Sequence, residues 1–250
     1  MPEAIPDYGP STYGERIAGV YDAWHEGATD VPATVAVLAD LARGGRVLEL
    51  GVGTGRIALP LAAQGVEVHG IDASEAMIAR LRAKPGGAQL SVTIGDFADV
   101  AVDGAFSLIF VVFNTFFALP SQEDQVRCFR NVARHLAPDG LFLIEAFVPD
   151  PTRYVRGQSV WTTRVDLDEV RLTVAQHDPV GQRVMSQHVV LAPGGIRLYP
   201  VQLRYAWPSE LDLMAQLAGL SLRERWADWQ RRPFSADTAR HISIYGHAPP

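Results

Sequence analysis

The first residues in this chain that indicate chemistry are three glycines. They alternate with other residues directly after a short apolar strand. Residues 47–50 read Val-Leu-Glu-Leu, Gly51, Gly53 and Gly55 follow, and a helical pattern begins near Ala58. Glycine adopts backbone angles closed to other residues and lacks the Cβ atom that would keep a ligand off the main chain. The first turn of a helix presents unpaired N–H groups, which suit a ligand with acceptor oxygens. The segment predicts a nucleotide-type cofactor at the edge of a parallel sheet.

An acidic residue ends the next predicted strand. Residues 66–71 are followed by Asp72, and Ser74 begins another helix. A carboxylate at this strand tip can accept hydrogen bonds from both ribose hydroxyls of an adenosine. Asp72 could instead serve only as a helix N-cap, but Ser74 can cap that helix alone. We therefore expect Asp72 to bind the ribose.

The spacing of these residues separates two families of nucleotide-binding enzymes. The dinucleotide fingerprint Gly-x-Gly-x-x-Gly requires a third glycine where this chain has Arg56. The run Glu-Leu-Gly-x-Gly-x-Gly, from Glu49 to Gly55, instead resembles motif I of the class I S-adenosylmethionine-dependent methyltransferases. Other motifs of that family follow in order within residues 46–147, ending with the turn Ala-Pro-Asp-Gly at 137–140.

The resemblance implies that S-adenosylmethionine is the cofactor and S-adenosylhomocysteine the product. It also implies that Asp96 takes the exocyclic amine of adenine and that Phe97 covers the ring, although Asp96 could be an ordinary turn residue. The residues that we expect to bind the cofactor are Tyr13, Tyr21, Glu49, Gly51, Gly53, Gly55, Asp72, Ala73, Met77, Asp96, Phe97 and Phe113.

The order of predicted elements indicates an α/β fold. Strands at 90–94, 106–112 and 141–145, with a helix at about 122–136, continue the alternation of strand and helix. A helix at 208–218 and a hairpin of strands at 221–226 and 241–246 would complete it. We expect a Rossmann-like, doubly wound and mostly parallel seven-stranded sheet, with an N-terminal helical lid and an antiparallel β insertion after the fifth strand.

The segment before the glycine loop reads as two helices between residues 11 and 43. Tyr13, Ile17, Tyr21 and Trp24 recur at helical intervals and form an apolar stripe. The stripe could pack on the sheet as core, whereas in related enzymes such a segment covers the cofactor. We expect residues 1–45 to form a lid in which Tyr13 or Tyr21 contacts the cofactor.

The segment 151–207 reads as strands in which apolar and polar residues alternate. It lies between the two parts of the predicted core, 46–150 and 208–250. This block resembles the β-rich insertion of the amino-sugar N,N-dimethyltransferases, where it covers the acceptor pocket or pairs subunits. Strand edges left exposed in the insertion could join two copies of the chain as a homodimer.

Methyl transfer from a sulfonium chiefly requires that an acceptor lone pair be held against the methyl carbon. A base is needed only when the acceptor must lose a proton early. Glu145 lies at the carboxyl end of the fifth strand and His188 on an insertion strand, so they are our two catalytic candidates. Glu145 could instead bind a local donor, and His188 could be structural.

Composition excludes several other classes. The net charge of −6 argues against nucleic acid as the substrate. No apolar run approaches the roughly 18 residues of a membrane helix, and the first residues lack a secretory signal. Cys128 is the single cysteine, so we expect a cytoplasmic protein without an internal disulfide. The histidines fall at no spacing that indicates a metal site, and we expect none.

The sequence thus predicts an enzyme that transfers a methyl group from S-adenosylmethionine to an oxygen, nitrogen or carbon atom of a small organic acceptor, such as a bacterial secondary metabolite. Two alternatives are an NAD-dependent oxidoreductase on a similar sheet and a binding module that has lost turnover. Arg56 in the place of the third glycine argues against the first, and the intact Glu49, Asp72 and Asp96 argue against the second.

Overall fold

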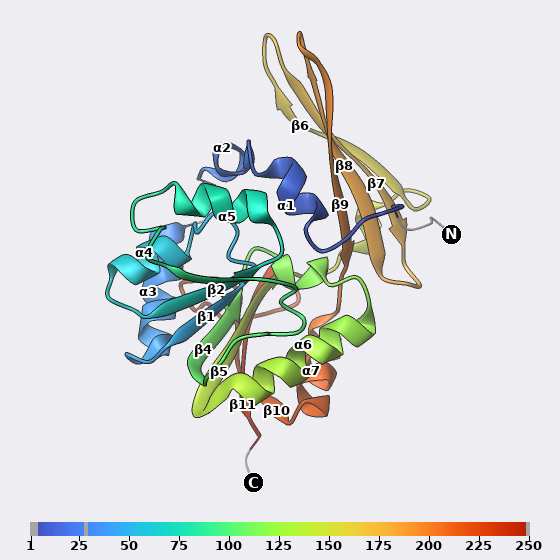
Figure 1. Ribbon diagram of the computed structural model, residues 1–250. Helices are drawn as coiled ribbons and strands as arrows, with labels where there is room; N and C mark the ends of the chain where they lie inside the picture. The colour runs from blue at the N-terminus through green and yellow to red at the C-terminus, as the bar shows by residue number, and fades with distance from the viewer. Residues whose placement is uncertain (1–4, 28–29, 249–250) are drawn as a thin grey trace.

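The computed structural model describes residues 5–27 and 30–248, and its main sheet has seven strands (Figure 1). They are β1 (Val47–Leu50), β2 (Val68–Asp72), β3 (Ser91–Ile94), β4 (Phe106–Val111), β5 (Leu136–Phe147), β10 (Leu220–Trp226) and β11 (Arg240–His247). Their order is β10-β11-β5-β4-β1-β2-β3, and β11 runs antiparallel to both of its neighbours. The predicted mostly parallel seven-stranded sheet is confirmed.

Helices cover both faces of this sheet. One face carries α3 (Val31–Ala42), α4 (Ala58–Ala63) and α5 (Glu75–Arg82), and the other carries α6 (Gln122–His135) and α7 (Pro208–Leu217). A hydrophobic core lies on each face of the sheet. In β1, Val47 packs in the core on the side of α3 and α4, and Leu48 packs in the core on the side of α6 and α7. All four residues of β1 are buried, as expected for a parallel strand covered on both sides.

The central strand β1 lies at the point where the strand order of the sheet reverses, because β2 and β3 lie on one side of it and β4 and β5 on the other. It pairs with β2 on one side and with β4 on the other, both in parallel. Open α/β sheets bind their ligands outside the carboxyl ends of the strands at such a point. The glycine loop leaves β1 at this edge, so the fold places it where a ligand site is expected.

The insertion forms a second, separate sheet. It consists of β6 (Gln158–Val165), β7 (Val170–Asp178), β8 (Arg183–Ala192) and β9 (Gly195–Arg204), paired antiparallel in chain order. Figure 1 shows its hairpins projecting beyond the body of the molecule, with α1 (Thr12–Ile17) between this sheet and α5. The predicted antiparallel block is confirmed.

The N-terminal segment differs from the prediction. It contains three helices, not two, because the first predicted helix divides into α1 and α2 (Tyr21–His25). Gly19 lies in the break, where its conformational freedom disfavours a continuous helix. Ile17 of α1 packs with Met77 of α5 and Tyr199 of β9, whereas α3 packs on the main sheet.

The start of β5 also differs. We predicted a turn at 137–140 that separates the helix from a strand at 141–145, but the strand begins at Leu136, directly after α6. Leu136 pairs with Phe106, and a register shift between Phe106 and Leu108 accommodates the extra residues. A Cβ atom on Gly140 would lie 2.8 Å from the Phe106 carbonyl oxygen, so glycine is required there.

Within residues 5–27 and 30–248, no helix is both long enough and apolar enough to cross a membrane.

Candidate functional site

The loop between β1 and α4 is shaped by its three glycines. Gly51, Gly53 and Gly55 have φ angles of 74°, 54° and 76°, which favour glycine. Gly51 and Gly53 line a cavity, and a Cβ atom on Gly53 would have no neighbour closer than 4.0 Å. Gly55 has a different role, because it packs against Leu59 and Leu81. The first two glycines leave the main chain open to a ligand, and the third allows close packing.

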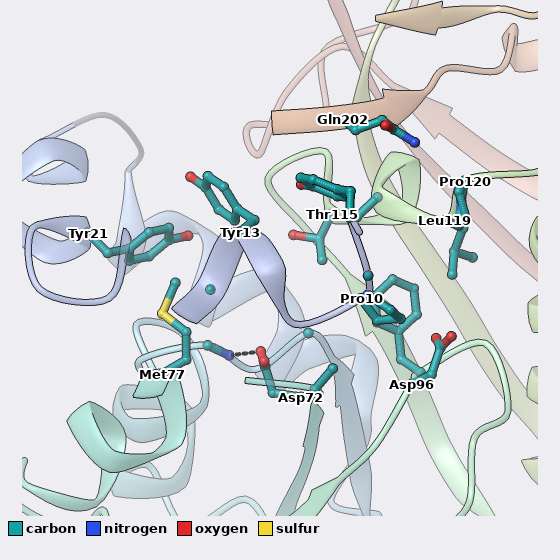
Figure 2. A pocket seen from close by; sticks show the side chains of 18 residues that line it. Pro10, Tyr13, Tyr21, Asp72, Met77, Asp96, Thr115, Leu119, Pro120 and Gln202 are labelled. Carbon is teal, nitrogen blue, oxygen red and sulfur yellow. Dashed lines mark hydrogen bonds between the residues drawn. The ribbon is translucent and has the colours of Figure 1, made fainter. Parts of the chain in front are cut away.

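Asp72 holds this loop from the end of β2. Its Oδ2 atom accepts a hydrogen bond from the Gly53 N–H at 2.7 Å, drawn dashed in Figure 2, and its Oδ1 atom accepts from the Ser74 N–H at 2.9 Å. Ser74, and not Asp72, caps α5 by accepting from the Met77 N–H. Each Asp72 oxygen keeps a further lone pair for a ligand hydroxyl. Burial raises the pKa of Asp72, against the opposing effect of these N–H bonds.

Most of the residues expected to bind the cofactor line one cavity, around which Figure 2 is drawn. Its walls include the predicted Tyr13, Tyr21, Gly51, Gly53, Asp72, Ala73, Met77, Asp96 and Phe97. They also include residues that the sequence analysis did not identify, namely Tyr8, Gly9, Pro10, Gly14, Thr115, Ala118, Leu119, Pro120 and Gln202.

The missed residues come from three places. Those at 8–14 precede or begin α1, and those at 115–120 follow β4 and include the 3-10 helix η1 (Thr115–Ala118). Position after the carboxyl end of a parallel strand is a signal that could have identified the second group. Gln202 comes from β9, and only the tertiary fold brings it to the cavity.

Three predicted cofactor residues lie outside this lining. Gly55 is the packing glycine described above, and Phe113 lines a neighbouring cavity. Glu49 is buried at the end of β1, where desolvation raises its pKa, and its Oε2 atom has no hydrogen-bond partner. A buried acceptor without a partner is costly. Such an acceptor beside an open glycine loop suits a ligand that carries N–H donors, as the amino group of S-adenosylmethionine does.

Hydrogen bonds and an ion pair hold helices α1 and α2 against the residues around the cavity. Glu15 Oε1 accepts from the Ser74 hydroxyl at 2.8 Å and from the Ala76 N–H at 3.1 Å. Asp22 accepts from the Thr54 hydroxyl at 2.6 Å and forms a 2.8 Å ion pair with Lys84. These bonds join the N-terminal helices both to the glycine loop and to α5. Tyr13 and Tyr21 of this segment also line the cavity.

A second cavity opens beside the first, on the side of β5 and the insertion. The two cavities share six lining residues, Tyr8, Tyr13, Tyr21, Thr115, Ala118 and Gln202. Burial raises the pKa of each of these tyrosines, so their phenols are neutral at pH 7. A molecule in the second cavity would therefore meet a ligand of the first at a neutral, largely aromatic junction.

Both catalytic candidates line the second cavity. Glu145 Oε2 accepts from the Phe113 N–H at 3.1 Å, and Glu145 Oε1 lies 3.9 Å from Arg240 Nη1. Burial raises the pKa of Glu145, although Phe113 and Arg240 oppose the shift. Oε2 thus binds a local donor, as the alternative interpretation expected, and Oε1 faces the guanidinium of Arg240 at the longer distance of 3.9 Å.

His188 reaches the same cavity from β8. Its Nδ1 atom lies 2.9 Å from the Thr173 hydroxyl oxygen, and burial lowers its pKa, so it is neutral at pH 7. Arg56 supplies a cation to the same cavity, with its guanidinium 3.8 Å from the centre of the Phe113 ring and Nη1 donating to the His25 carbonyl oxygen. Burial and this cation together lower the pKa of His25 to about 4.

No group of three or more metal-binding side chains occurs among the residues that the structure describes.

Replacing Gly51 with alanine is expected to weaken cofactor binding and to lower thermal stability. The new Cβ atom would lie 2.5 Å from Thr115 Cγ2, at a positive φ angle that strains any L-residue by about 1 kcal/mol. Differential scanning fluorimetry with and without S-adenosylmethionine measures both effects. Adding Thr115→Ser removes the clashing methyl and should restore part of the loss. Gly194→Ala is the control, since a Cβ atom there meets nothing within 4 Å. Equal melting temperatures for Gly51→Ala and Gly194→Ala would refute the prediction.

Comparison with known proteins agrees with this geometry. Residues 47–140 match a family model described as a methyltransferase domain. The chain is 31% identical, over 94% of its length and 97% of the relative's, to the cypemycin N-terminal methyltransferase of a Streptomyces species. It is 28% identical, over 75% of its length and 77% of the relative's, to a dTDP-4-amino-2,3,4,6-tetradeoxy-D-glucose N,N-dimethyltransferase of Saccharopolyspora spinosa.

A solved structure is closer in sequence than either relative. The CcbJ methyltransferase from Streptomyces caelestis superposes with a TM-score of 0.91 at 43% identity, covering 97% of this chain and all of that one. These proteins give no support to an oxidoreductase or to a binding module without turnover. The chain belongs to the class I S-adenosylmethionine-dependent methyltransferases that act on small molecules.

Proposed function

We propose that this enzyme methylates the nitrogen atom of a small organic amine of bacterial secondary metabolism. The observation that carries the proposal is the second cavity, which meets the cofactor cavity at shared residues and contains Glu145, His188 and Arg56. Two relatives support the choice of nitrogen, since their names describe methylation of an N-terminus and of an amino sugar.

The first task of the protein is to position the two reactants. S-adenosylmethionine supplies, when bound, a methyl group already activated by a positively charged sulfur. Gly51, Gly53, Asp72 and Asp96 would hold this cofactor, and Tyr13 and Tyr21 would cover it. Aromatic faces attract a cation, and the lid excludes water from the junction. The acceptor is thereby held for in-line attack without a further electrophile.

The second task is to manage one proton. An amine that is protonated in water has no lone pair for attack, so it must enter or become neutral before transfer. The Oε1 atom of Glu145, which lies 3.9 Å from Arg240, can accept this proton, and neutral His188 provides a second acceptor in the same cavity. The fixed charge of Arg56 disfavours an ammonium nearby and therefore favours the reactive neutral amine.

Labelled S-adenosylmethionine and a panel of amines, phenols and carboxylic acids test the proposal. We expect label to transfer to amines, with secondary and primary amines distinguished by the number of methyl groups in the product. Transfer to phenols or carboxylic acids alone would overturn the choice of nitrogen and leave the methyltransferase assignment intact.

We also propose that two copies of the chain pair through the outer face of the insertion sheet. One row of cross-strand neighbours on this face consists of branched aliphatic residues, Val165, Val170, Leu191 and Ile196. Val165 and Ile196 are 75% and 69% exposed, and Val160 of the same face is 69% exposed. A contiguous apolar face of this kind is typical of a protein interface.

Sedimentation velocity tests this pairing. Ile196→Lys places a charge at the β9 end of this row and should shift the protein from dimer to monomer. Val180→Lys is the matched control, because Val180 is equally apolar and 85% exposed but lies in the turn between β7 and β8. A wild-type protein that sediments as a monomer at every concentration would contradict the proposal.

We place the enzyme in a reducing cytoplasm on the basis of its single cysteine. Cys128 is free and buried on α6, and burial raises the pKa of its thiol. A protonated and buried thiol is poorly reactive, so its role is in packing.

A further inference from the structure

A third cavity lies between the chain that follows β5 and the inner face of the insertion sheet. Its walls include Pro149, Arg153 and Tyr154 on one side, and Trp161 and His177 on the other. It meets the second cavity at four residues that line both, Phe147, His188, Val201 and Leu203. The space available to an acceptor therefore continues past His188, away from the cofactor.

The walls of this third cavity are mostly flat rings. Tyr154 stacks on His177, with ring centroids 4.3 Å apart and planes inclined by 26°. His177 Nε2 lies 2.9 Å from the Tyr205 hydroxyl, which fixes both rings in place. Trp161 is partly exposed in the cavity, and the guanidinium of Arg153 lies 5.4 Å from the centre of its ring.

Charge at the cavity is confined to its exposed rim. Arg153 and Asp150 are exposed and of opposite sign, while burial lowers the pKa of His177 and keeps this ring neutral at pH 7. Neither a phosphate nor an ammonium would find an uncompensated partner of opposite charge here. Flat aromatic walls instead favour a ring, through stacking and the removal of apolar surface from water.

We infer that the third cavity is a distal subsite for a ring that the acceptor carries at the end away from its amine. The substrate class is then an elongated amine of two parts: the nitrogen lies beside Glu145, and an apolar or aromatic ring lies between Tyr154 and Trp161. This inference rests on the proposed function, because it takes the second cavity as the acceptor site.

Calorimetry in the presence of saturating S-adenosylhomocysteine tests the subsite. The probes are phenylalkylamines of increasing linker length and alkylamines with the same linkers but no ring. We expect the ring to improve affinity about tenfold once the linker spans the two cavities, a gain of the size expected for one stacked aromatic group plus its buried area. A ring that adds nothing at any linker length would overturn the subsite.

Two variants separate the subsite from general effects on folding. Trp161→Ala should abolish the gain from the ring while the affinity for S-adenosylhomocysteine stays that of the wild type. Trp207→Ala removes a tryptophan that is 40% exposed and outside the cavity, and it should keep the full gain. A Trp161→Ala variant that retains the gain contradicts the inference. If neither probe series binds, the amine-binding function itself fails, and the subsite fails with it.

Discussion

Replacing Asp72 with alanine is expected to weaken S-adenosylmethionine binding by about 1–3 kcal/mol, a rise in Kd of roughly 5- to 150-fold. The variant loses the acceptor that we assign to the ribose hydroxyls. It also releases the Gly53 N–H, which Asp72 binds at 2.7 Å, and so frees the glycine loop that forms the floor of the cavity. Both losses act on the first cavity, which we propose to bind the cofactor, and not on the second, which Asp72 and Gly53 do not line.

Isothermal titration calorimetry measures the Kd for S-adenosylmethionine. A second substitution at Asp72 and a control variant show how much of the change comes from the lost carboxylate. Asp72→Asn keeps one oxygen for the loop or for the ligand, so its loss should lie between wild type and Asp72→Ala. Asp99→Ala is the control, because Asp99 is an exposed acid that pairs with Arg127 and does not line the cavity. An Asp72→Ala enzyme that binds with wild-type affinity would show that the ribose lies elsewhere.

The part of the first cavity that the glycine loop, Asp72 and Asp96 form could be predicted from the sequence, because these residues lie at strand ends. Gly51 directly follows β1, Asp72 is the last residue of β2 and Asp96 follows β3 closely, and parallel strands bring their carboxyl ends to one edge. Local sequence therefore determines their position in space. The alternation of apolar and glycine residues in 47–55 is sufficient to identify the loop.

The junction between the cavities could not be predicted in the same way. Gln202 lies on β9, far along the chain from the loop, and no local pattern encodes how the insertion sheet packs against the N-terminal helices. Tyr8 precedes any helical pattern, so periodicity could not identify it. The predicted boundaries failed for a related reason: the pairing of Leu136 with Phe106 and the break at Gly19 depend on tertiary contacts and backbone freedom.

Replacing Glu145 with glutamine is expected to lower kcat/KM for an amine acceptor by about 10²- to 10⁴-fold, the usual contribution of a positioned acid–base group. Glutamine keeps the size of the side chain and still accepts from the Phe113 N–H, but it cannot take a proton. The affinity for S-adenosylhomocysteine should not change, because Glu145 lines the second cavity and does not line the first. Matched kinetics and calorimetry on wild type and variant measure both quantities.

The pH dependence identifies the role of Glu145 more sharply than the rate alone. Burial raises the pKa of Glu145, so its protonated form persists to higher pH than for an ordinary glutamate. Wild-type kcat/KM should fall as the pH drops through this raised value, and Glu145→Gln should lack that fall. Arg240 lies 3.9 Å from Glu145 and lowers its pKa, so Arg240→Met should raise the pKa further and move the fall to higher pH. A Glu145→Gln enzyme with an unchanged pH profile and rate would leave His188 as the proton acceptor and assign Glu145 only to the local bond with Phe113.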